Sequence, residues 1–225
     1  MSKTEQLDNL FDEWRRKQAD EWQQWNEGKK DKSSYLKRYR EHENLKKINP
    51  AKSFTPDGII DEEAWNNGEK ILFILKEANG QWMLDENLED NIVEIDNGEF
   101  WFRKIVKDNI NHNIKRKLNK LSAEKFGESE LKAVAYMNIN KRGGAKSELV
   151  GVLKSYIKEY KEYIKTEIEI ISPEIICICC GKNKAYVNTL EEIIQELECK
   201  PKVEKYYHPA ARIKWEKYKE GIDNI

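Results

Sequence analysis

One short apolar stretch constrains the fold of this chain more than any other segment. Residues 71–75 read Ile-Leu-Phe-Ile-Leu and are followed at once by Lys-Glu-Ala-Asn-Gly at 76–80. A brief apolar run that ends in turn-forming residues is typical of a strand buried on both faces of a parallel sheet. Ligands of open α/β sheets bind just beyond the carboxyl ends of such strands. The stretch predicts a central strand over 70–76 and makes Glu77 a candidate functional residue, with a solvated loop acid as the alternative.

Further strands alternate with helical patterns along the rest of the chain. The other expected strands cover 131–137, 174–180 and 203–207, and the main expected helices cover 100–110, 145–169, 188–197 and 212–221. Alternation of this kind favours an α/β fold with parallel strands. We therefore predict an α/β domain over residues 51–225, built as a four-stranded, mostly parallel sheet with helices on both faces.

Residues 1–50 have a different pattern, which predicts a helical hairpin appended to that domain. Apolar residues recur at helical spacing, and Asn49-Pro50 ends the second run. The face of the first helix carries Trp14, Trp22 and Trp25. We expect these tryptophans to dock onto the main domain. The alternative is a surface for a protein partner or for nucleic acid.

Composition limits which binding partners and which cellular compartment we expect for this protein. Among 225 residues, 40 Lys and Arg stand against 41 Asp and Glu, which gives a formal net charge of −1. A nucleic-acid surface would therefore have to be a local patch. No apolar run reaches the length of a membrane span, and the amino terminus lacks the apolar core of a signal peptide. These features predict a cytoplasmic protein with no membrane partner.

The four cysteines are predicted to be reduced rather than ligands of a metal. Cys177, Cys179 and Cys180 lie inside an expected strand, and Cys199 lies further along the chain. Alternation along a strand directs Cys177 and Cys179 to one face and Cys180 to the other, so they do not converge on one ion. We expect plain core cysteines, no metal and no other cofactor.

Polar side chains follow three of the four expected strands. Glu77 and Asn79 follow the first, Asn138 and Asn140 the second, and His208 the fourth. Each has an ordinary explanation, since Asn forms turns and a His before Pro is commonly a loop residue. Because the carboxyl ends of parallel strands share one edge, these groups are expected to converge on one pocket. The chain lacks the glycine-rich dinucleotide motif, the P-loop, the Gly-x-Ser-x-Gly elbow and the His-Glu-x-x-His zinc motif.

These motifs resemble those of the uracil-DNA glycosylase superfamily over roughly residues 54–220. Residues 76–80, Lys-Glu-Ala-Asn-Gly, resemble the water-positioning motif Gly-Glu-Ala-Pro-Gly of its iron–sulfur branch. Residues 135–138 end in the Asn that reads the base in this superfamily, and 207–212, Tyr-His-Pro-Ala-Ala-Arg, resemble its His-Pro-Ser/Ala motif. The chain departs from the pattern at Lys76 and Asn79 and in the placement of its cysteines, so no cluster is implied.

The resemblance implies a base-excising hydrolase with DNA as its partner. Glu77 would orient or deprotonate water, and His208 would donate a hydrogen bond to the departing base. The remaining implied roles are base binding by Ala78, Asn79, Gly80 and Asn138, base stacking by Phe100 or by Trp82, and phosphate contacts from Lys141, Arg142 and Arg212. Two alternatives stay open: a non-catalytic module that binds modified nucleic acid in repair or in defence against phage, and an α/β protein for another small molecule.

Overall fold

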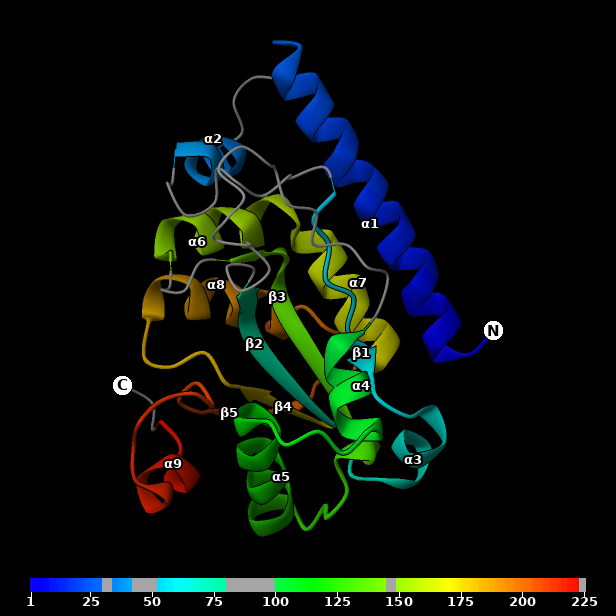
Figure 1. The fold of residues 1–225 in the computed structure, drawn as a ribbon, viewed down its shortest axis with the longest axis vertical. Helices are drawn as coiled ribbons and strands as arrows, with labels where there is room; N and C mark the ends of the chain where they lie inside the picture. The colour runs from blue at the N-terminus through cyan, green and yellow to red at the C-terminus, as the bar shows by residue number, and fades with distance from the viewer. Residues whose placement is uncertain (30–33, 42–51, 80–99, 145–148, 223–225) are drawn as a thin grey trace.

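The computed structural model describes residues 1–29, 34–41, 52–79, 100–144 and 149–222 of the chain (Figure 1). In that part of the chain, the helices are α1 (Lys3–Asn26), α2 (Ser34–Glu41), α3 (Glu62–Asn67), α4 (Trp101–Lys107), α5 (Asn113–Phe126), α6 (Val150–Glu159), α7 (Lys161–Ile171), α8 (Lys184–Gln195) and α9 (Trp215–Glu220). The strands are β1 (Gly58–Ile59), β2 (Ile71–Asn79), β3 (Val134–Gly144), β4 (Ile175–Ile178) and β5 (Lys202–Lys205), and a 3-10 turn, η2 (Leu131–Ala133), precedes β3.

The sheet has the order β1-β3-β2-β4-β5. The pairs β3–β2, β2–β4 and β4–β5 are parallel, and β1 pairs antiparallel with β3 at one edge. All four strands expected from the sequence are present and parallel, which confirms an α/β fold. The fifth strand, β1, was not predicted because it is two residues long and follows a segment that has the composition of a turn.

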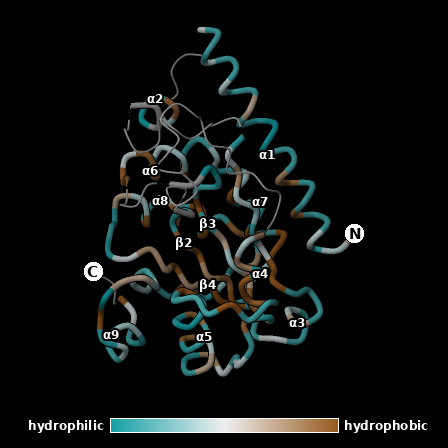
Figure 2. Tube along the Cα trace, in the orientation of Figure 1, coloured by the Kyte–Doolittle hydropathy of each residue, from teal (hydrophilic) through white to brown (hydrophobic). Residues whose placement is uncertain are grey.

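Helices cover both faces of the sheet (Figure 1). The strands are the apolar centre of the molecule, and the helices turn hydrophilic residues outward (Figure 2). Along β2, Leu72 and Ile74 join the core under α1, α6, α7 and α8, whereas Ile71, Phe73 and Leu75 join the core under α4, α5 and α9. All five side chains are at most 1% exposed. Burial on both faces is what the unbroken apolar run at 71–75 predicted.

The helical segment after β3 differs from its prediction. One helix was expected over 145–169, but α6 ends at Glu159 and α7 begins at Lys161, with Tyr160 capping both. Tyr160 has φ −110° and ψ 24°, outside the helical region. The apolar face continues through Tyr156, Tyr160 and Ile164, all fully buried, so the sequence pattern carries no sign of the break. Residues 145–148 lie outside the described part of the chain.

The first helix is built into the main core. Leu7, Phe11 and Trp14 belong to the same cluster of buried side chains as β2 and β3. Trp14 is fully buried and stacks on Tyr163, with ring centroids 5.2 Å apart. The expected docking of the tryptophan face is confirmed for Trp14. Helix α1 packs on α7, and α2 packs on α6. Residues 30–33 and 42–50 of the predicted hairpin lie outside the described residues.

The cysteines lie as their spacing predicts. Cys177 and Cys179 are buried on the face covered by α4, α5 and α9, and Cys180 is buried on the opposite face. All four cysteines are free thiols, and burial raises the pKa of Cys177 well above its ordinary value. Within the described residues, no helix has both the length and the apolar character that crossing a membrane requires.

Candidate functional site

Glu77 and Asn140 meet across the two central strands. The parallel register places Leu75 opposite Asn138 and Glu77 opposite Asn140. Asn140 Nδ2 donates a hydrogen bond to Glu77 Oε2 at 3.0 Å. The sequence placed Glu77 and Asn79 after the end of the first strand and Asn138 and Asn140 after the end of the second. This was wrong, because β2 continues to Asn79 and β3 continues to Gly144. Polar side chains are tolerated there because they bond to one another and to neighbouring elements.

Alternation along the strands brings Glu77, Asn138 and Asn140 to one face of the sheet. On β2, Leu75 faces the core under α4, α5 and α9, and Glu77 follows it by two residues. On β3, Tyr136 faces the same core and precedes Asn138 by two residues. Since side chains two residues apart share a face, these three groups form a polar continuation of that core. The predicted convergence of the first two strand ends therefore agrees with the geometry.

Asn138 carries a buried amide with unused hydrogen-bonding capacity. Its side chain is fully buried, and its Oδ1 accepts a hydrogen bond from the Tyr136 hydroxyl at 3.4 Å. Its Nδ2 has no hydrogen-bond partner within the described part of the protein. Burial raises the pKa of Tyr136 well above its ordinary value, so this phenol stays a donor. An unpaired buried donor is costly, which makes Asn138 a candidate contact for a ligand acceptor.

Phe100 lies beside this group of residues. It caps the amino end of α4 and packs on Tyr136, with ring centroids 6.3 Å apart. The Arg103 guanidinium lies over the Phe100 ring at 4.9 Å from the centroid. Phe100 is 6% exposed. The structure thus brings the predicted stacking residue to the face that carries Asn138, with its ring covered.

The strand order marks the same edge as the place for a ligand. From β2 the chain crosses to β3 on one side, and later returns to β4 on the other side of β2. The connection that leaves β2 and the connection that leaves β4 therefore run in opposite directions along the sheet. In doubly wound sheets, such a switch point opens a crevice in which ligands bind. Glu77 lies at this end of β2.

His208 lies beyond the carboxyl end of β5, two strands away from β2. It is half-buried, its Nδ1 accepts a hydrogen bond from the Ala210 amide at 3.2 Å, and its carbonyl accepts one from the Ala211 amide at 2.8 Å. These bonds close a tight turn around Pro209. The histidine is therefore at the predicted edge of the sheet and held by its own loop. Arg212, four residues later, is exposed.

The prediction that Lys141 and Arg142 contact phosphate is wrong. The motif resemblance implied that they contact phosphate, but both side chains are fully buried inside the protein. Lys141 Nζ lies 2.6 Å from Asp57 Oδ1 and 2.8 Å from Glu167 Oε1. Arg142 Nη2 donates to the Gln18 carbonyl and to the Tyr160 hydroxyl, each at 3.1 Å. Neither cation can reach a phosphate in this arrangement.

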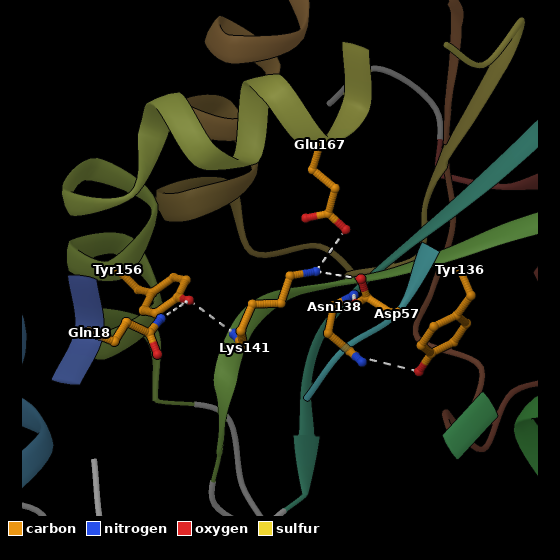
Figure 3. Close-up of polar contacts among 7 residues, drawn as sticks. All are labelled: Gln18, Asp57, Tyr136, Asn138, Lys141, Tyr156 and Glu167. Carbon is orange, nitrogen blue, oxygen red and sulfur yellow. Dashed lines mark hydrogen bonds and ion pairs between the residues drawn. The ribbon is translucent and has the colours of Figure 1, made fainter. Parts of the chain in front are cut away.

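Sequence reasoning missed the carboxylates that accompany Lys141. Asp57 lies in a Pro-Asp-Gly segment that has the composition of a turn, and Glu167 lies within an apolar helical face. Figure 3 shows the Lys141 ammonium between the two carboxyl groups. Burial, followed by the charge of Asp57, raises the pKa of Glu167 well above its ordinary value. An acid in the middle of an apolar stripe was the available sign that this helix covers a buried cation.

The remaining predicted residues lie at or beyond the end of β2. Ala78 and Asn79 complete this strand, but their side chains are outside the described part of the structure. Gly80 and Trp82 also lie outside the described residues. No protein-family model matches the chain, and no curated protein matches it either. Function is therefore inferred from the site itself.

Proposed function

We propose that the protein is a hydrolase that cleaves the N-glycosidic bond of uracil, or of another deaminated or modified base, in DNA. The observation that carries the proposal is the placement of a carboxylate, Glu77, beside a buried amide with a free donor, Asn138, on one face of two adjacent strands. Both lie toward the carboxyl edge, where the strand order favours ligand binding. The motif resemblance supports the same reaction.

The chemistry of the bond suits these groups. When the bond between the sugar and the base breaks, its electrons leave with the base and positive charge develops on the sugar, as in other glycosidic cleavages. Water adds to the sugar carbon and loses a proton. Glu77, held by Asn140 at 3.0 Å, would orient that water and accept its proton. Asn138 Nδ2 would donate to a base oxygen, and His208 would stabilise the negative charge on the departing base.

A binding module without catalysis is the second candidate, and one observation favours it. Among the three predicted phosphate contacts, Lys141 and Arg142 are buried, and Arg212 is exposed. Each exposed cation strengthens binding to the DNA backbone. With only one of the three predicted cations exposed, the case for an enzyme that binds duplex DNA tightly is weaker. A protein that recognises a modified base or nucleoside would need fewer such contacts.

Strand scission distinguishes the two candidates. Single- and double-stranded oligonucleotides with one uracil are incubated with the protein and then heated in alkali, which breaks the chain at an abasic site. Cleavage that is lost in Glu77→Gln and reduced in His208→Ala supports the hydrolase. Absence of cleavage on uracil, hypoxanthine and xanthine substrates, together with a gel shift, supports the binding module. Absence of both cleavage and binding contradicts both candidates.

A further inference from the structure

A fully buried group of ionisable side chains lies behind the candidate site. It consists of Asp57, Lys141 and Glu167, hereafter the buried triad, and the side chains of all three have no solvent exposure. Asp57 precedes β1, Lys141 belongs to β3 and Glu167 belongs to α7. The triad therefore joins three elements that are distant in sequence (Figure 3).

The first helix, α1, packs against the Lys141 member of the triad. The Lys141 ammonium lies 5.3 Å from the centre of the Phe11 ring and 5.6 Å from that of Trp14. The Lys141 amide donates to the Tyr156 hydroxyl at 3.2 Å, and Gln18 of α1 donates to the same hydroxyl at 2.8 Å. Both polar ends of Lys141, its backbone amide and its ammonium, are thus held inside the protein.

Stability alone does not account for this arrangement. Removing charges from water costs several kcal/mol for each ion, and apolar replacements of a buried ion group are commonly neutral or stabilising. Buried ions are retained in some proteins because they fix one arrangement of the surrounding elements. The question is therefore what the triad holds in place.

The contacts of Asp57 show what is held, because its two carboxylate oxygens accept hydrogen bonds from different residues. Oδ1 accepts from Lys141 Nζ at 2.6 Å, and Oδ2 accepts from the backbone amide of Asn138, also at 2.6 Å. Strand β1 pairs with β3 only at Tyr136 and Ala135, so β1 has no backbone carbonyl opposite the Asn138 amide. The Asp57 carboxylate takes the place of a strand carbonyl at that amide, and Lys141 compensates its charge.

We propose that the buried triad is a positioning device for the candidate site: Lys141 and Glu167 hold the Asp57 carboxylate, which fixes the Asn138 backbone and so keeps Asn138 and Asn140 in register with Glu77. The inference rests on the proposed function only in taking these residues to be the site. None of the triad touches a substrate, so its members are positioning residues.

The test removes all three ionisable side chains of the buried triad at nearly constant volume. In Lys141→Met combined with Asp57→Asn and Glu167→Gln, no charge of the triad is left buried. We expect the protein to fold and the Asn138 amide to exchange hydrogen roughly tenfold to a hundredfold faster, as expected for the loss of a charge-assisted hydrogen bond. In NMR spectra, the side-chain amide signals of Asn138 and Asn140 should move.

The control is an ion pair of the same length on the surface. Lys161 Nζ and Glu196 Oε1 are 2.6 Å apart, and both side chains are exposed to solvent. Lys161→Met combined with Glu196→Gln should leave exchange at Asn138 unchanged. Unchanged exchange and unchanged side-chain signals in the triad variant would overturn the inference.

If the triad variant does not fold, hydrogen exchange in the unaltered protein tests the inference instead. The Asn138 amide should exchange as slowly as that of Phe73 in the centre of the sheet, and exchange as fast as a solvent-exposed amide would overturn the inference. These readouts do not depend on cleavage. Failure of the scission assay would therefore contradict the proposed reaction and leave the role of the triad to be judged on exchange alone.

Discussion

Asn140 Nδ2 donates to Glu77 Oε2 at 3.0 Å across the β2–β3 ladder, and this contact fixes one oxygen of the carboxylate. Asn140 Oδ1 accepts a hydrogen bond from the Arg142 backbone amide at 3.0 Å, so both polar atoms of the Asn140 side chain are held. A general base is effective when its geometry is set before substrate arrives. Asn140 therefore orients Glu77, and the two residues are expected to act together.

Replacement of Glu77 by glutamine should remove cleavage and preserve the fold. The substitution keeps the size of the side chain and removes the group that accepts a proton from water, so the rate should fall by about a hundredfold or more. The measurement is strand scission on a uracil-containing oligonucleotide. Glu174→Gln is the matched control, because Glu174 is exposed and pairs with Lys70 just before β4 begins. Equal rates in both variants would exclude Glu77 as the base.

Replacement of Asn140 by aspartate should shift the pH dependence of cleavage. Two carboxyl groups would then share the space of the present 3.0 Å contact, and like charges so close cannot both ionise readily. One of the two should titrate at a higher pH, so the acidic limb of the rate profile should move upward by about one pH unit or more. Cleavage rates measured from pH 5 to 9 test this, and an unmoved profile would argue against coupling.

The sheet was predictable from the sequence because each parallel strand is a compact apolar run. Residues 71–75 and 134–137 are buried on both faces, and such runs are visible without knowledge of their neighbours. The break at Tyr160 was not predictable, because the helical apolar period continues through it. Strand β1 was missed since two residues give no period at all.

The site was predictable only in part, and Lys141 shows why. A lysine next to an arginine and two glycines has the composition of an exposed basic loop. Its partners, Asp57 and Glu167, are 84 and 26 residues away. Whether a charged side chain is buried depends on such distant partners, which a local pattern does not contain. By contrast, Glu77 and His208 lie toward the predicted edge because strand direction alone determines it.

Truncation of Trp14 should destabilise the whole protein. The side chain is fully buried between α7, Phe54 and Tyr156, so Trp14→Ala should lower the free energy of unfolding by about 3–5 kcal/mol. Urea denaturation followed by circular dichroism measures this. Trp25→Ala, at a half-buried position on the same helix, should cost clearly less. A loss below about 1 kcal/mol for Trp14→Ala would mean that α1 is a separable appendage.

Glu167→Gln should change how stability depends on pH. Burial and then the Asp57 charge raise the pKa of Glu167 in the folded protein, so its contribution is fully present below its ordinary pKa and is lost as pH rises toward the raised value. The glutamine amide keeps an acceptor for Lys141 and does not titrate. Relative to the unaltered protein, the variant should gain about 1.4 kcal/mol for each pH unit within that window.

Urea denaturation of both proteins at pH 5, 7 and 9 measures the expected divergence. At pH 5, close to the ordinary pKa of a glutamate, the two free energies of unfolding should be most similar, and the difference should grow in favour of the variant at pH 7 and 9. Glu196→Gln, on the surface beside Lys161, is the control for a general effect of removing an acid. A difference that is constant across pH would mean that Glu167 is already ionised, and the ammonium of Lys141 would then neutralise two carboxylates instead of one.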